Sequence, residues 1–466
     1  MSLRYDYDFL CIGSGPASQR AAIQAAKIGK RTALIERSLV VGGVCADTGT
    51  IPSKSFREAV LFFSDRQNRS LAHERPRSVK RPTARQLLAR VESMIRLQTE
   101  VVEDQLRRND VTMLHGEASF KDPHSILVTS ESGTQAVTAA NMLIAVGTIP
   151  APPPGVPAEK DLIVTSDGVV QLTCLPRTMV VIGAGVIGIE YASMFAALGV
   201  EVTVVDKRER PLEFLDREIV DELLHQMRNQ RVIFRLAETV ERIEIVEGPP
   251  RRAVMLLQSG KHLVSELVLF SVGRLGATDR LNLAAAGLKA DDRGRLTVDK
   301  QFRTEVPHIY AAGDVIGYPS LAATSAEQGR LAACYAFEVD AGPMAKHFPI
   351  GIYSIPEISM VGQPEHELTA LKIPYETGLA RYREIARGQI LGDDSGLLKM
   401  LFHREDRRLL GVHVIGTGAT ELIHIGQAVL GLGGGLDYFM TTAFNYPTLA
   451  ECYKVAALDA FNKLHA

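Results

Sequence analysis

Two short glycine-rich runs, each followed by an acidic residue at the same spacing, carry the chemistry that the sequence offers most plainly. The first reads Gly-Ser-Gly-Pro-Ala-Ser over residues 13–18, and the second reads Gly-Ala-Gly-Val-Ile-Gly over residues 183–188. Glycines in such a turn let the backbone approach a pyrophosphate, whose charge the following helix N-terminus stabilises. Glu36 and Asp206 stand where an acid can accept hydrogen bonds from a ribose. The pattern predicts two dinucleotide sites.

Each glycine run needs a strand before it and a helix after it, and the flanking residues supply both. The expected strands are residues 9–12 and 32–35 in the first unit and residues 179–182 and 202–205 in the second. The helices between them are expected to end near Gly29 and Gly199, because glycine commonly terminates a helix. A flavin can exchange a hydride with a nicotinamide, so we expect one flavin and one nicotinamide dinucleotide.

The composition bounds the class of protein. The 466 residues are 46% hydrophobic and 23% charged, as in a globular protein of about three domains. A net charge of −2 argues against a nucleic-acid partner. No apolar stretch approaches the ~18 residues of a membrane span, and the first residues lack an apolar signal core, which predicts a cytoplasmic protein without a membrane partner. The cysteines, at neither disulfide nor zinc spacing, predict no metal site. They are Cys11, Cys45, Cys174, Cys334 and Cys452.

Three further motifs accompany the glycine runs in order along the chain. They are Leu-Ile-Ala-Val-Gly at 143–147, Val-Gly-Arg at 272–274 and Thr-Glu-Val-Pro-His-Ile-Tyr-Ala-Ala-Gly-Asp at 304–314. Over essentially its full length the chain resembles a pyridine nucleotide–disulfide oxidoreductase. The resemblance implies that the first glycine run binds FAD and that the second binds NAD or NADP.

The resemblance also implies the layout of the chain. The expected fold is α/β, with two Rossmann-like dinucleotide-binding domains (FAD and NAD(P)) and a C-terminal α+β dimerisation domain. The expected bounds are 1–152 for the first part of the FAD domain, 153–275 for the NAD(P) domain, 276–346 for a central segment completing the FAD domain, and 347–466 for the interface domain. Prolines across 150–157 predict a stiff crossover. A homodimer is expected, and larger homo-oligomers stay open.

The resemblance assigns residues to each site. For FAD these are Gly13, Gly15, Ser18, Glu36, Gly42, Gly43, Cys45, Ala118, Gly147, Asp314, Leu321 and Ala322. For NAD(P) they are Gly183, Gly185, Gly188, Asp206, Lys207, Arg208 and Gly273. Lys54 matches the family lysine beside the flavin N5, and Glu190 matches the acid that pairs with it. An ammonium group there would stabilise negative charge on the reduced ring. An ordinary salt bridge between helices is the alternative, but the places of both residues in motifs favour the functional interpretation.

The family's redox-active disulfide is incomplete in this sequence. Cys45 matches the first cysteine of the motif, but the second position is Thr50. A disulfide needs two sulfurs, so none can form there, and Cys45 is expected to pack against the flavin. The C-terminal histidine of the family's acid–base pair is replaced by Tyr446, although Glu451 remains. Tyrosine, with an ordinary pKa of about 10, shuttles protons poorly at neutral pH, which argues against a disulfide substrate.

The acid of the second unit is followed at once by cations. Asp206 can accept a hydrogen bond from a ribose 2′-hydroxyl, as in a site for NAD. Lys207, Arg208 or Arg210 could pair with the 2′-phosphate of NADP. The sequence leaves open which cation does so, and a solvated charged turn is the alternative.

A narrower resemblance rests on residues 49–54, 313–322 and 444–448, and it is to members that exchange a hydride between two nicotinamide dinucleotides. The expected activity is a reversible, FAD-dependent transfer between NADPH and NAD⁺, with both nucleotides as substrates of one site in a ping-pong scheme. The alternatives are an NAD(P)H-dependent diaphorase or quinone reductase, and a non-catalytic flavin-binding redox sensor. The direction of hydride flow and the preferred nucleotide stay open.

Overall fold

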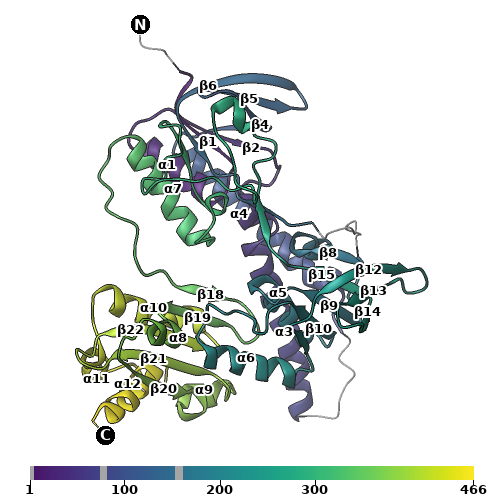
Figure 1. Cartoon of the computed structure of the whole chain (residues 1–466), viewed down its shortest axis with the longest axis vertical. Coiled ribbons are helices and arrows are strands. Elements are labelled where there is room, and N and C mark those ends of the chain that lie inside the picture. Colours follow the sequence, from purple (N-terminus) through teal and green to yellow (C-terminus); the bar gives the residue numbers. More distant parts are fainter. Residues whose placement is uncertain (1–4, 74–80, 153–160, 466) are drawn as a thin grey trace.

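The computed structural model describes residues 5–73, 81–152 and 161–465, and Figure 1 shows these residues arranged in three bodies. The first body surrounds strand β1, the second surrounds strand β9, and the third is the C-terminal sheet around strand β22. The sheet around β1 and the sheet around β9, which carry the two glycine runs, are both flanked by helices. This arrangement confirms an α/β fold with two dinucleotide-binding units and a C-terminal α+β body.

The first body contains a sheet in which β1 lies between β2 and β6. Its strands are β1 (Tyr7–Ile12), β2 (Thr32–Glu36), β3 (Thr112–His115), β4 (Glu117–Asp122), β5 (Ser125–Ser130), β6 (Gly133–Ile144) and β17 (Ile309–Ala311). β1 pairs in parallel with both neighbours, so Cys11 lies opposite Leu34 and Leu143. Helices α1 (Pro16–Lys27) and α7 (Ala322–Ala336) pack against each other beside the sheet. Because β17 also pairs with β6, the late part of the chain returns to this body.

The second body repeats the same plan with a parallel sheet in the order β11-β10-β9-β15-β8. Its strands are β8 (Ile163–Thr165), β9 (Thr178–Ile182), β10 (Glu201–Asp206), β11 (Ile233–Leu236) and β15 (Leu267–Phe270). Helices α5 (Val186–Ala197) and α6 (Arg217–Asn229) follow β9 and β10. An antiparallel ribbon of β12 (Val240–Val246), β13 (Arg252–Leu257) and β14 (His262–Ser265) extends from this body.

The sequence-based predictions for both units are confirmed by the helix ends as well as by the strands. Helix α1 ends at Lys27 and helix α5 ends at Ala197. Gly29 and Gly199 follow in the left-handed conformation, with φ of +77° and +75°. Each N–H donates to a carbonyl of the last helical turn, which terminates the helix as glycine commonly does.

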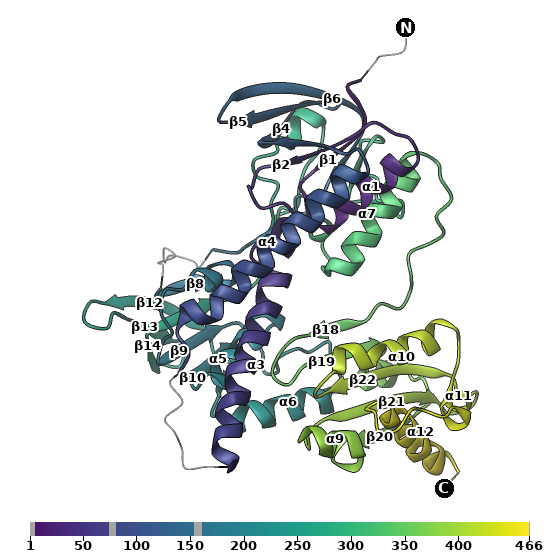
Figure 2. The same ribbon diagram turned by 180° about the vertical axis from the view of Figure 1, so that it is seen from behind.

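The first and second bodies are joined by a short neck and by two long helices. In the neck, β7 (Thr148–Pro150) pairs with β16 (Arg274–Gly276), and residues 153–157 of the predicted proline crossover lie outside the described part. Figure 2 shows α3 (Thr50–His73) and α4 (Ala84–Arg108) running from the first body to the second. Within the described residues, no helix is long and apolar enough to cross a bilayer.

The third body is an antiparallel sheet in the order β18-β19-β22-β21-β20. Its strands are β18 (Ile350–Ile352), β19 (Ile358–Gly362), β20 (Tyr375–Arg381), β21 (Leu397–His403) and β22 (Leu409–Ile415), and its helices are α8 (Glu365–Ala370), α9 (Ala386–Leu391), α10 (Ala419–Gly431), α11 (Leu436–Thr441) and α12 (Glu451–Leu464). Fully buried Lys399 binds it to the second body. Its Nζ lies 3.1 Å from Asp216, 2.5 Å from Glu218 and 2.5 Å from Glu365. These carboxylates, grouped closely enough for a metal ion, thus already surround an ammonium group.

Candidate functional site

A cavity of about 700 Å³ opens where the three bodies meet, and most residues predicted for the flavin site line it. The predicted residues in its wall are Gly13, Gly15, Glu36, Gly43, Cys45, Lys54, Ala118, Gly147, Glu190, Asp314, Leu321 and Ala322. The predicted residues that do not line it are Ser18, Gly42, Gly183, Gly185, Gly188, Asp206, Lys207, Arg208 and Gly273. The structure therefore brings most of the FAD set together at this cavity, whereas none of the predicted NAD(P) residues lines it.

The first glycine turn is shaped by close backbone approaches. Gly13 has φ of +100°, and a Cβ there would lie 2.5 Å from the carbonyl oxygen of Ala145. A Cβ on Gly43 would lie 2.9 Å from Cα of Gly15. Helix α1 has Gly15 as its N-cap and no side chain capping it, so its first N–H groups face the cavity region unshielded. Such a helix N-terminus favours a phosphate.

The acid of the first unit is held by neutral donors. One carboxylate oxygen of Glu36 accepts hydrogen bonds from the Ser14 amide at 2.9 Å and the Ser14 hydroxyl at 2.5 Å. The other accepts from the Ser38 amide at 2.8 Å. The Ser14 hydroxyl in turn accepts from the amides of Gly42 and Gly43, at 2.8 and 3.1 Å. Ser14 thus ties the glycine turn, the acid and the start of the next helix into one network.

Lys54 and Glu190 meet at the cavity wall from different bodies. Lys54 Nζ on α3 lies 2.8 and 3.0 Å from the two carboxylate oxygens of Glu190 on α5. Glu190 also accepts the backbone N–H of Tyr353 at 2.8 Å, so the third body joins the pair. The ring centroid of Tyr353 lies 4.9 Å from Lys54 Nζ. With 26% of the Lys54 side chain exposed and only 4% of that of Glu190, the ammonium is the accessible half of the pair.

Cys45 and Thr50 lie side by side where the family has its disulfide. Cys45 is in the short helix α2 (Gly43–Asp47), and the Thr50 hydroxyl is within hydrogen-bonding reach of its thiol. Burial raises the pKa of Cys45, and that hydrogen bond only partly offsets the effect. A thiol with a raised pKa is a weak nucleophile at neutral pH. Among the described residues all five cysteines are free, and Cys45 lines the cavity.

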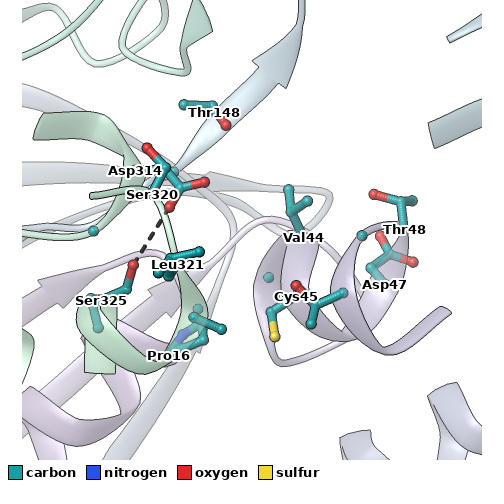
Figure 3. A pocket seen from close by; sticks show the side chains of 18 of the residues that line it. Pro16, Val44, Cys45, Asp47, Thr48, Thr148, Asp314, Ser320, Leu321 and Ser325 are labelled. Atoms are coloured by element: carbon teal, nitrogen blue, oxygen red, sulfur yellow. Dashed lines mark hydrogen bonds between the residues drawn. The ribbon is translucent and has the colours of Figure 1, made fainter. Parts of the chain in front are cut away.

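Figure 3 shows the opposite wall of the cavity, where Asp314, Ser320 and Leu321 face the helix that carries Cys45. The Ser325 hydroxyl donates to Asp314 at 3.5 Å. Burial raises the pKa of Asp314, and the nearby charge of Arg274 acts in the other direction. An acid placed here can hold a polar ligand chain through its carboxylate oxygens.

The second glycine turn repeats the first in its backbone. Gly183 has φ of +106°, and a Cβ there would lie 2.5 Å from the carbonyl oxygen of Ser271. Helix α5 again begins after an N-cap glycine, Gly185, without a side-chain cap. The two turns differ at the third glycine position of the motif. In the second turn this position is Gly188, where a Cβ would clash with the carbonyl oxygen of Gly183. In the first turn this position is Ser18, which is fully buried and whose hydroxyl has no hydrogen-bond partner within the described structure.

The acid of the second unit is paired with a cation. Asp206 accepts the amide of Ala184 at 2.5 Å, the counterpart of the Glu36–Ser14 bond. Its two oxygens also accept Arg208 Nε at 2.9 Å and Nη2 at 2.7 Å. Burial alone would raise the pKa of Asp206, but the bonds from Arg208 and Ala184 outweigh it and lower that pKa.

Most of the chain matches a known protein family. Residues 7–329 match the family described as pyridine nucleotide-disulphide oxidoreductase, and residues 348–457 match the dimerisation domain of that family. The chain belongs to the pyridine nucleotide-disulphide oxidoreductase family.

Relatives in this family are similar over nearly the whole chain. A soluble pyridine nucleotide transhydrogenase from Mycobacterium tuberculosis (strain ATCC 25177 / H37Ra) is 51% identical over 99% of this chain and 98% of its own. One from Photobacterium profundum is 43% identical over 98% of each chain. Among solved structures, the HOCl-induced flavoprotein disulfide reductase RclA from Escherichia coli is 25% identical, with a TM-score of 0.87 over 97% of this chain and 99% of its own.

Several residues at this family site escaped the sequence analysis. Arg274 in the neck donates to the side chain and carbonyl of Thr148, both at 2.9 Å, and pairs with Asp167 at 3.1 Å. Tyr353 contacts Glu190 through its backbone N–H. Nearly every residue type has this donor, so the contact cannot be predicted from the sequence. Arg274 is the last residue of the Val-Gly-Arg motif, and its place in that motif was the only feature of the sequence that pointed to it. Tyr446, in place of the family histidine, is 69% exposed in the single chain.

Proposed function

We propose that the chain is a flavoprotein enzyme that transfers a hydride reversibly between NADPH and NAD⁺. Relatives 43–51% identical over nearly the whole chain carry the name of that activity. The observation that carries the proposal is local. Thr50 faces Cys45 in place of a second sulfur, while the Lys54–Glu190 pair is intact at 2.8 Å. The chain thus keeps its charged pair for hydride transfer and lacks the thiol pair for disulfide reduction.

The dinucleotide in the first unit is FAD in this proposal, and the cavity fits it. Gly13 and Gly43 leave room that a Cβ would fill, and α1 presents uncapped N–H groups. We assign Glu36 to the adenosine ribose and Asp314 to the ribityl chain. Bound FAD would supply the chemistry by accepting a hydride from one nicotinamide and returning it to another. The remaining FAD residues named from the sequence complete this assignment.

Lys54 and Glu190 are the proposed catalytic pair. The Lys54 ammonium places a positive charge on the cavity wall, and Glu190 together with the Tyr353 ring fixes its position. Glu190 itself is nearly inaccessible, so it acts by orienting Lys54 and the segment around Tyr353. A charge fixed before the reaction costs no reorganisation when the electrons move.

The second unit is the proposed nicotinamide dinucleotide site, and one such site dictates the order of binding. NADPH and NAD⁺ must occupy it in turn, so NADP⁺ leaves before NAD⁺ enters. Val186 and Ile187, at the start of α5, reach the cavity wall, which connects this turn to the flavin cavity. The assignment of Gly183, Gly185, Gly188 and Gly273 to this site rests on the turn geometry and the family motif.

We also propose the arrangement of the whole protein. The domain bounds are 1–152, 153–275, 276–346 and 347–466, supported by the return of β17 to the first sheet. A homodimer through the third body follows from the match to the family's dimerisation domain. A cytoplasmic location suits the free cysteines, since thiols persist in a reducing compartment.

Steady-state kinetics tests the proposal. With NADPH and a NAD⁺ analogue varied together, we expect parallel lines in double-reciprocal plots, because the first product leaves before the second substrate binds. Intersecting lines would contradict the ping-pong order. A much faster rate with a quinone than with NAD⁺ would establish a quinone reductase instead, and protein purified without yellow flavin would favour a non-catalytic role.

A further inference from the structure

The carboxylate of Asp206 is already saturated in the protein. One oxygen accepts the amide of Arg208 at 2.8 Å and its Nε at 2.9 Å. The other accepts Arg208 Nη2 at 2.7 Å and the Ala184 amide at 2.5 Å. A carboxylate has about four lone-pair sites, and all are used here. A ribose 2′-hydroxyl therefore has no place on Asp206 while the Arg208 guanidinium remains there.

The first unit shows that this saturation is not a requirement of the turn. Glu36 accepts three hydrogen bonds, all from the hydroxyl or backbone of Ser14 and Ser38. The bond that holds the glycine turn, from Ser14 or Ala184, is common to both units. What the second unit adds is the guanidinium of Arg208.

Arg208 can leave Asp206 without disturbing the turn. Its side chain is 37% exposed, so the guanidinium can rotate toward solvent or toward a ligand. Its backbone N–H and the Ala184 amide remain on the carboxylate when it does. The guanidinium also matches a phosphate, since its planar fork binds two oxygens at once.

We propose that Arg208 is a specificity switch that lets one site accept both nucleotides. In the structure its guanidinium lies on the carboxylate of Asp206. It turns onto the 2′-phosphate when the nucleotide carries one, and it leaves Asp206 free to bind the 2′-hydroxyl when the nucleotide does not. Each nucleotide breaks the same ion pair, which narrows the difference between their affinities. This inference rests on the proposed function, because it places both nucleotides at this turn.

The neighbouring cations fit the role less well. Lys207 is exposed and adjoins Asp206 in the chain, but Arg208 is the residue whose guanidinium lies on the carboxylate. Arg210 lies 3.6 Å from Asp221 on α6 and so faces that helix. The structure thus selects Arg208 among the three cations that the sequence left open.

Two fragments without nicotinamide test the switch. Binding of adenosine 5′-monophosphate and of adenosine 2′,5′-bisphosphate to the holoenzyme is measured by calorimetry. Arg208→Ala should weaken the bisphosphate about 10- to 100-fold, the loss expected for hydrogen bonds between charged groups. The same variant should bind the monophosphate more tightly than the unmodified protein, because Asp206 is uncovered. Arg208→Lys should weaken the bisphosphate less, and raising the salt concentration should weaken the bisphosphate more than the monophosphate.

Arg177→Ala is the matched control, since exposed Arg177 precedes β9 at the end of the sheet away from the turn. It removes one positive charge from the same body and should leave both affinities unchanged. Flavin content and the melting temperature establish that Arg208→Ala is folded. Weaker monophosphate binding in Arg208→Ala, or loss of bisphosphate binding in Lys207→Ala instead, would overturn the switch. Because the fragments cannot transfer hydride, this result is independent of whether NADPH and NAD⁺ exchange one.

Discussion

The two dinucleotide turns share a backbone and differ in what surrounds the acid. Gly13 and Gly183 have φ of +100° and +106°, and a Cβ on either would lie 2.5 Å from a carbonyl oxygen. Glu36 is held by neutral donors, whereas Asp206 is covered by the guanidinium of Arg208. The two units thus share the backbone turn, and the guanidinium of Arg208 distinguishes the surroundings of the two acids.

Matched substitutions of the first glycines should separate the two turns with the largest effect. An alanine at either position is strained by positive φ and by contact with a carbonyl oxygen, at a cost of about 1–3 kcal/mol each. Gly13→Ala should yield protein that has lost its flavin. Gly183→Ala should retain the flavin but should no longer be reduced by NADPH. Flavin absorbance per protein, followed by anaerobic titration with NADPH, measures both.

Gly133→Ala is the control that separates the strain of a positive φ from the contact of a Cβ with a carbonyl oxygen. Gly133 has φ of +127° at the β5–β6 turn, and a Cβ there would meet nothing within 4 Å. It should keep both flavin content and reduction by NADPH. If Gly183→Ala lost flavin as fully as Gly13→Ala, the two turns would not bind separate dinucleotides.

The Lys54–Glu190 ion pair connects α3 to the second unit at the cavity wall, and breaking it should give the next largest effect. Lys54→Met removes the charge at the cavity wall and leaves Glu190 buried without its partner. We expect the rate of flavin reduction to fall about 100- to 1000-fold, as for loss of one preorganised electrostatic group. Stopped-flow absorbance with NADPH measures this rate.

Glu190→Gln is the companion variant, because a glutamine oxygen can still accept the Tyr353 N–H. Its effect on the rate should be smaller than that of Lys54→Met, since the ammonium remains in place. Equal losses would mean that Glu190 contributes more than orientation. An unchanged rate in Lys54→Met would reduce the pair to an ordinary salt bridge.

Much of this comparison could be predicted from the sequence. Glycine positions, short apolar strands and the acid spacing are local patterns, and they placed both turns, both helix ends and the acids correctly. The pairing of Lys54 with Glu190 came from the family resemblance and is present at 2.8 Å. Cys45 beside Thr50 likewise follows from the family motif.

The remainder depends on contacts between distant parts of the chain. The Tyr353 amide reaches Glu190 from another body, and a backbone donor has no sequence signature. Lys399 lies in a strand of buried apolar residues, and its acidic partners belong to helices elsewhere in the sequence. Arg208 was one of three neighbouring cations, and the sequence does not show which of their side chains lies on Asp206.

The second unit is attached to the third body through the buried ammonium group of Lys399. The stability of this attachment should depend on pH. His413 on β22 lies opposite Lys399 on the neighbouring strand β21. Burial lowers the pKa of His413 to about 4. Between pH 6.5 and 4 the unfolded chain therefore binds a proton that the folded chain does not, so stability falls as the pH falls. At pH 5 the loss is about 2 kcal/mol.

Thermal unfolding at pH 7 and pH 5 measures this effect. His413→Gln removes the titrating group and should flatten the dependence of the melting temperature on pH in this window. Asp216, whose pKa is lowered despite its burial, adds a second loss at lower pH as it becomes protonated. A pH dependence unchanged in His413→Gln would assign the effect to other groups.

Ser18 marks the smallest difference between the turns, and two substitutions resolve what it contributes. Its hydroxyl is buried and has no hydrogen-bond partner among the described residues, so Ser18→Ala should stabilise the first body by about 1 kcal/mol. Ser18→Gly removes the same hydroxyl, but glycine costs about 1 kcal/mol in a helix, so the two effects should nearly cancel. Melting temperatures of the flavin-bound variants, compared at one protein concentration, give the order Ala above Ser and Gly. If Ser18→Gly were instead the most stable variant, the Ser18 side chain would be crowding the contact between α1 and its glycine turn. Gly188 would then show the same contact without that crowding.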